Sequence, residues 1–263
     1  MRGRGRASMA LLVAGVIGLV VALAPAAGLA AGGEAPVTVT VGMEPPVSLQ
    51  FGISPKRLPS PIRGTTKLAF AIEEEPGTGV RPGITSATIG LDKSIELDPR
   101  GLPICPYFVV QIESAGPGGC PGSSLGHAEA TAEIDLPEQP PVEIHAHGGI
   151  YNVSVGDGAP RLGIELILGA PVSGALRILV PVRPVDEGRI GSEATIKIPE
   201  ITGGSGHLLD LHLELGRSFM RHGERVGFVT AECDKGRLVS TLSATLDDGA
   251  EAREESIRAC SPR

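Results

Sequence analysis

The sequence predicts an all-β fold, either an antiparallel β-sandwich or a barrel-like double sheet. Three observations lead to this prediction. Apolar and polar residues alternate with a period of two in many short segments, so each segment can bury one face of a strand. No internal window keeps a 3.6-residue apolar stripe over three turns, as a helix would. Gly and Pro fill nearly every gap between these segments, which is typical of sandwiches and barrels of short strands.

The predicted strands follow one another along most of the chain. They cover residues 37–41, 47–53, 68–72, 107–112, 127–136, 142–147, 176–182, 209–215, 226–230 and 238–246. In residues 68–72, for example, Leu68, Phe70 and Ile72 share one face. Residues 248–259 contain few apolar side chains, so we expect an extended tail there. A short helix is the alternative for this tail, because Ala, Glu and Arg follow an acidic start.

Residues 1–30 have the features of a cleaved signal peptide. Arg2, Arg4 and Arg6 precede a charge-free apolar run, and small residues at 24–30 fit signal-peptidase cleavage, which we place after Ala30. An uncleaved N-terminal anchor, leaving the protein tethered to the membrane, is the alternative. After cleavage, residues 31–263 would form one secreted β-sandwich domain, with two packed sub-domains as a variant, and no remaining segment would span a membrane.

Charge and composition argue against several classes of partner. Removal of the three arginines leaves 20 basic against 30 acidic residues, a net charge of −10. Such a surface repels phosphate backbones, so we expect no nucleic-acid partner. With five Phe, two Tyr and no Trp, the chain has few aromatic side chains on which a base or a sugar ring can stack.

All four cysteines lie beyond the signal peptide, which points to disulfides in an oxidising compartment. They are Cys105, Cys120, Cys233 and Cys260. Local pairing, of the first with the second and of the third with the fourth, is the simplest of three connectivities. A redox or zinc role is disfavoured, because the chain has no C-x-x-C pair and no two cysteines with zinc-ligand spacing.

The segments around these cysteines resemble a known pattern. Residues 91–93, 98–106, 120–121 and 124–126, with residues 226–233, 248–249 and the last cysteine, are similar to uncharacterised secreted proteins of high-GC soil actinobacteria. The resemblance implies export, β-structure and paired cysteines. It implies no activity and no functional residues.

Two histidine-containing stripes are the candidate metal ligands. Glu143, His145 and His147 alternate on one face of a predicted strand. The second stripe consists of Asp210, His212 and Glu214. If the two strands were neighbours, His145, His147, Asp210 and His212 could converge on zinc or another transition metal. The alternative is that both stripes are solvated outer faces of half-buried strands, where polar residues belong.

Residues 122–126 match the G-x-S-x-G form of a nucleophile elbow around Ser124. That motif needs a strand-turn-helix context, and His127 is too near in sequence to supply the usual base. The alternative is a turn rich in small residues.

The sequence therefore favours a secreted, non-enzymatic structural or binding protein of the cell envelope or the medium. We expect it to need no cofactor and to act on an unknown cell-surface or protein partner. An extracellular metal-binding protein is the second hypothesis, and a secreted serine hydrolase is the third.

Overall fold

A computed structural model describes residues 47–60, 62, 64–74, 82–105, 120–153 and 160–262, all within one compact unit, Pro36–Arg263. The predicted signal peptide and the predicted strands at 37–41 and 107–112 lie outside these residues. The described part consists of β-strands and two 3₁₀ turns, η2 (Pro121–Ser123) and η3 (Thr202–Gly204). The all-β prediction is confirmed.

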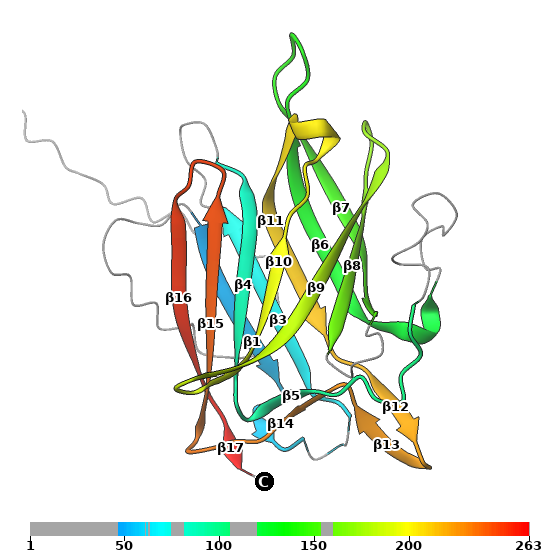
Figure 1. The fold of residues 1–263 in the computed structure, drawn as a ribbon, viewed down its shortest axis with the longest axis vertical. Coiled ribbons are helices and arrows are strands. Elements are labelled where there is room, and N and C mark those ends of the chain that lie inside the picture. Colours follow the sequence, from blue (N-terminus) through cyan, green and yellow to red (C-terminus); the bar gives the residue numbers. More distant parts are fainter. Residues whose placement is uncertain are drawn as a thin grey trace, which may run out of the picture. The chain divides into compact units, whose positions relative to one another are not determined.

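Seven antiparallel strands form a closed barrel (Figure 1). In spatial order they are β11 (Gly206–Leu215), β6 (Ser124–Ile134), β7 (Val142–Asn152), β8 (Arg161–Leu168), β9 (Gly174–Glu187), β10 (Ile190–Lys197) and β4 (Ile84–Asp92). One residue pair, Leu208 with Ile84, joins β11 to β4 and closes the barrel. Beyond this pair the two strands separate, because each takes a different partner.

Four further strands extend the sheet from this seam. β3 (Lys67–Glu74) pairs with β11 and with β1 (Val47–Ser54), while β15 (Arg237–Leu246) pairs with β4 and with β16 (Glu251–Ala259). The two outermost strands, β1 and β16, are in contact. The Arg258 side chain of β16 donates from Nε to the carbonyl oxygen of Phe51, at 2.6 Å. Side chains therefore link the two edges of the sheet.

Residues 251–259 form a strand, so the prediction of an extended segment is confirmed and the helical alternative is wrong. The strand forms because buried and exposed side chains alternate along these residues. Ala252 and Ser256 are buried, whereas Glu251, Arg253 and Glu255 are exposed.

Three short strand pairs gather at the lower end of the molecule in Figure 1. They are β5 (Ile95–Leu97) with β14 (Val229–Ala231), β12 (Ser218–Arg221) with β13 (Glu224–Gly227), and β2 (Arg57–Leu58) parallel to β17 (Ser261–Pro262). The predicted strand 226–230 is thus divided between β13 and β14.

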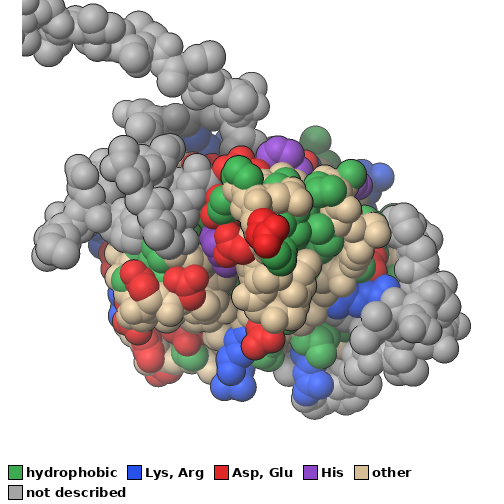
Figure 2. Space-filling view, turned by 90° about the horizontal axis from the view of Figure 1, so that it is seen from above, with side chains coloured by type: hydrophobic (Ala, Val, Ile, Leu, Met, Phe, Trp, Pro, Cys, Tyr) green, Lys and Arg blue, Asp and Glu red, His purple; other side chains and the backbone are tan. Residues whose placement is uncertain are grey.

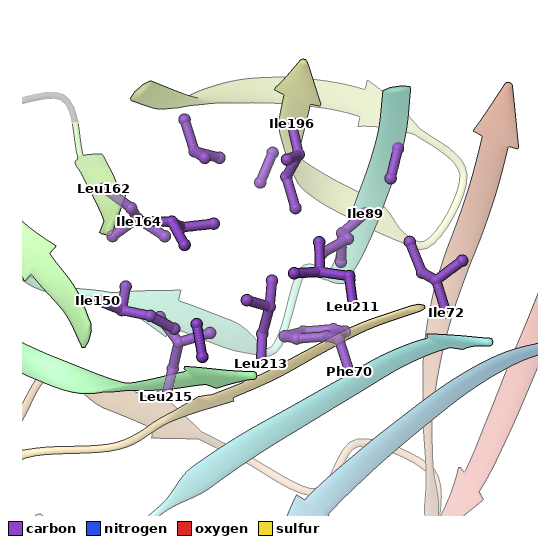
Figure 3. Packing of buried hydrophobic residues seen from close by; sticks show 14 of the residues in the cluster. Phe70, Ile72, Ile89, Ile150, Leu162, Ile164, Ile196, Leu211, Leu213 and Leu215 are labelled. Carbon is purple, nitrogen blue, oxygen red and sulfur yellow. The ribbon is translucent and has the colours of Figure 1, made fainter. Parts of the chain in front are cut away.

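The alternating apolar side chains fill the inside of the fold as one continuous core. Figure 3 shows part of it, with Phe70 and Leu213 facing Ile89 and Ile196 from the opposite wall. An apolar void of about 20 Å³ remains at the centre. Such a space holds one water molecule at most, and its walls offer no polar partner. This part of the barrel interior is therefore a packed core and leaves no room for a ligand.

Two glycines allow neighbouring strands to approach closely. A Cβ atom on Gly148 would lie 1.6 Å from the carbonyl oxygen of Glu165, and one on Gly126 would lie 1.8 Å from that of Glu214. Any side chain there would push β7 from β8 or β6 from β11. Both positions are on strands that curve around the barrel.

Candidate functional site

The two predicted metal-ligand stripes lie on the outside of the barrel and are not adjacent. Strand β6 separates β7 from β11, so His212 faces Glu129, which in turn faces His147. In the next row Asp210 faces Thr131, which faces His145. Neighbouring strands are about 4.8 Å apart, so the stripes are separated by about 10 Å.

Carboxylates lie beside the histidines of this surface. His212 Nε2 is 3.3 Å from Oε1 of Glu73, and His207 Nε2 is 3.5 Å from Oε1 of Glu133. Figure 2 shows histidine and acidic side chains next to one another at the upper end. Among the described residues, no group of three His, Cys, Asp or Glu side chains is placed to hold a metal ion. Metal binding by the predicted residues stays a prediction that metal analysis must test.

Ser124 does not sit in a nucleophile elbow. It is the first residue of strand β6, whereas the serine of an elbow is followed by a helix. Its carbonyl oxygen accepts a hydrogen bond from Nη1 of Arg217 at 2.6 Å. The hydroxyl of the preceding Ser123 donates to the carbonyl oxygen of Cys120 at 3.0 Å. The motif therefore forms a hydrogen-bonded turn at the start of a strand.

Both predicted disulfides are present with the predicted local connectivity. Cys105 pairs with Cys120 at a Cα–Cα distance of 5.6 Å, and Cys233 pairs with Cys260 at 5.7 Å. The first bridge packs with Tyr151 and Val153 in a small cluster separate from the main core. The second joins the segment after β14 to the end of β16.

A cleft of about 290 Å³ lies at the lower end. We call it the arginine cleft. Its walls come from β5 and the segment after it, from β13 and β14, and from the segment before β3, with one residue from β12. It is lined by Pro59, Ser60, Gly64, Thr66, Glu96, Asp98, Arg100, Arg221, Arg225, Val226, Gly227, Val229, Thr230 and Ala231.

Asp98 organises the arginines of this cleft. Its Oδ1 accepts from Nε of Arg100 at 2.7 Å, and its Oδ2 accepts from Nη2 of Arg100 at 3.0 Å and from Nη1 of Arg221 at 2.6 Å. Burial alone would raise the pKa of Asp98, but the hydrogen bonds from the two guanidinium groups outweigh it and lower the pKa to about 2. This carboxylate is therefore ionised and fully engaged at neutral pH.

Two arginine side chains of the cleft keep N–H donors that could bind a ligand. The Arg100 side chain is 71% exposed although one edge of it binds Asp98. Arg225 is exposed on β13, and no other described residue forms an ion pair with it. Three arginines against Glu96 and Asp98 give the described lining one net positive charge, on a chain of net charge −7.

The arginine cleft is not visible in the sequence pattern. Asp98 and Arg100 are close in sequence, but Arg221 is 123 residues from Asp98. The local signal is the Asp-Pro-Arg segment directly after β5, which places a carboxylate two residues before an arginine. Nothing in that segment indicates which distant arginine completes the arrangement.

Comparison of the chain with protein-family models, curated proteins and solved structures gives no match. Among the described residues, no helix has the length and hydropathy needed to cross a bilayer. The two disulfides fit an extracellular protein. A functional assignment must therefore rest on the geometry of the sites.

Proposed function

We propose that the protein is a secreted, non-enzymatic binding protein that takes up a small ligand in the arginine cleft. Two sequence features support export: the predicted signal peptide at residues 1–30 and the placement of all four cysteines beyond it. The two disulfides are consistent with folding in an oxidising compartment.

The observation that carries this proposal is the contrast between the two hollows. The central void holds about 20 Å³ and is entirely apolar, while the arginine cleft holds about 290 Å³ and is lined by charged and hydroxyl groups. Ligand sites are concave and contain a few polar groups that fix orientation. The volume of the cleft suits a ligand the size of one or two amino-acid residues.

The acidic groups of the cleft favour binding over catalysis. A general base needs a pKa near the working pH and a free oxygen. Asp98 has a pKa of about 2 and both of its oxygens accept hydrogen bonds from arginine side chains. The Glu96 side chain is 67% exposed to solvent. Asp98 is therefore not prepared for proton transfer.

Export can be tested by expressing the full chain in a bacterial host and sequencing the N-terminus of the protein recovered outside the cytoplasm. We expect the mature chain to begin at Ala31. A protein that stays in the membrane fraction and still begins at residue 1 would support the tethered alternative instead.

Binding at the cleft can be tested with a variant that blocks it. Thr230 is exposed on β14 and lines the cleft, so Thr230→Trp should fill part of it. Thr85→Trp is the matched control, because Thr85 is exposed on β4 and does not line the cleft. We expect amide NMR signals of β5, β13 and β14 to shift when small polar ligands are added, and Thr230→Trp alone to abolish the shifts. Shifts confined to other strands would disprove the assignment of the site.

A further inference from the structure

We infer that the arginine cleft recognises a carboxylate group on its ligand, bound by Arg225 together with the exposed edge of Arg100. This inference rests on the proposed function and specifies the chemical class of the ligand. The guanidinium group offers a planar fork of N–H donors whose spacing matches the two oxygens of a carboxylate.

The two arginines differ in how much of their hydrogen-bonding capacity is already used. Arg100 binds Asp98 through Nε and Nη2, and its Nη2 lies 3.6 Å from Oε1 of Glu96. These contacts hold the guanidinium in one orientation and leave Nη1 available. Arg225 has no ion-pair partner among the described residues, so its whole fork is available. A ligand would therefore meet one fixed donor group and one adaptable donor group.

The hydroxyl of Thr66 is one more group that a polar ligand could meet in the cleft. Thr66 lines the arginine cleft although only 4% of the residue is exposed. No other described residue forms a hydrogen bond with its hydroxyl. By contrast, the hydroxyl of the neighbouring Ser60 lies 2.7 Å from that of Thr65. A hydroxyl can donate one hydrogen bond, and a ligand oxygen in the cleft could accept it from Thr66.

The charge balance favours a carboxylate over a phosphate. The described lining has three positive and two negative side chains, so one bound negative charge neutralises it. A phosphate carries up to two negative charges at neutral pH, and its second charge would face Glu96 and Asp98 without compensation. A neutral amide of the same shape would place an NH₂ group against the arginine N–H groups. Both are hydrogen-bond donors, so no hydrogen bond forms between them and the amide binds more weakly.

The test is an NMR titration of the exported, oxidised protein with matched probes. N-acetyl-alanine and N-acetyl-alaninamide differ only at the carboxylate, and acetate and inorganic phosphate complete the set. We expect the carboxylates to shift the amide signals of β13 and β14. The amide should bind at least tenfold more weakly, and phosphate should bind more weakly than acetate.

Variants identify the donors. Arg225→Gln should weaken carboxylate binding ten- to a hundredfold, the range for loss of a hydrogen bond to a charged group. Arg225→Lys should recover part of the loss, because it keeps the charge without the fork. Arg183→Gln is the control, since Arg183 is an exposed arginine on β9 outside the cleft. Thr66→Val should weaken binding as well, at unchanged melting temperature.

Each result bears on a separate claim. Equal binding of the acid and its amide, or an unchanged affinity in Arg225→Gln, would overturn the carboxylate inference while cleft binding itself stands. Tighter binding of phosphate than of acetate would also overturn it. If none of the four probes shifts the cleft signals but another ligand does, the carboxylate inference fails and the proposed function survives. If the probes still shift the amide signals in Thr230→Trp, the proposed function is contradicted as well.

Discussion

Replacing the buried Asp92 with asparagine should lower the free energy of unfolding by about 3–5 kcal/mol, the range for breaking a buried charge pair. Asp92 ends β4, and only 2% of its side chain is exposed. Oδ1 accepts from the backbone N–H of Ser94 at 3.0 Å and from its hydroxyl at 2.8 Å. Oδ2 accepts from Nε and Nη2 of Arg189 at 3.1 and 2.9 Å, and from the N–H of Val239 at 2.9 Å.

The magnitude follows from what asparagine can replace. The asparagine side chain has one oxygen, which can accept hydrogen bonds either from Ser94 or from Arg189 and Val239. Its NH₂ group must then face the other set of donors. If the NH₂ faces Arg189 and Val239, the arginine can turn partly to water, because 28% of its side chain is exposed. The N–H of Val239 is buried and loses its partner, which alone costs about 1–3 kcal/mol. Loss of the charge pair accounts for the rest.

The assay is unfolding in guanidinium chloride at pH 7 with the disulfides intact. Asp186→Asn is the control, because the Asp186 side chain is 88% exposed and solvent screens its ion pair with Lys93, so its loss should change stability little. Burial tends to raise the pKa of Asp92, but hydrogen bonds from Ser94, Val239 and Arg189 outweigh it and lower the pKa. The stabilisation is therefore present above the usual carboxyl range and is lost as the pH falls through the lowered value. A loss below about 1 kcal/mol at pH 7 would refute this reasoning.

Three more changes test the fold. Glu254→Gln should stabilise the protein by about 1 kcal/mol at pH 7 in thermal unfolding, because Oε1 of Glu254 is buried without a partner among the described residues. Burial raises the pKa of Glu254, so ionisation costs stability as the pH rises, and the gain should vanish in acid; a gain that persists there would contradict this. Gly148→Ala should destabilise by about 1–3 kcal/mol in urea unfolding, since its Cβ would lie 1.6 Å from the Glu165 carbonyl oxygen, and an unchanged midpoint would count against the close approach of β7 and β8. Cys233→Ser with Cys260→Ser should lower the free energy of unfolding by about 3–4 kcal/mol, measured against the oxidised protein, and a loss near zero would mean that the bridge constrains little.

Several strands with one buried face were predicted from the sequence, whereas a strand that is buried on both faces was not. The strand at 209–215 stands out because Leu211, Leu213 and Leu215 alternate with polar residues, and the structure confirms it as β11. Strand β8 was missed because residues 162–166 are all buried, so its sequence lacks a period of two. Glu165 is buried on the outer side, where Arg177 binds it at 2.8 Å.

The closure of the barrel and the candidate site depend on long-range pairing that local patterns do not encode. The seam between β11 and β4 is one pair, Leu208 with Ile84, and β4 carries no clear alternation because most of its residues are buried. The two histidine stripes were correctly placed on strands, but their separation depends on β6 lying between β7 and β11. That order follows from the hairpin of β6 and β7 and from the register of β11, and the hairpin alone is local in sequence.

The second disulfide links two segments that lead into the lining of the arginine cleft, which gives the cysteines a role beyond closing a loop. Cys233 lies two residues after Ala231, the last lining residue of β14. Cys260 leads into β17, whose Ser261 donates its N–H to the carbonyl oxygen of Lys56 at 3.1 Å. β17 pairs with β2, and the chain then passes directly into the lining segment that begins at Pro59. The bridge thus limits how far β14 can move from the lining segment that begins at Pro59. A cleft built from strand pairs of two to four residues has few hydrogen bonds of its own, so such a covalent link can preserve its shape without a ligand.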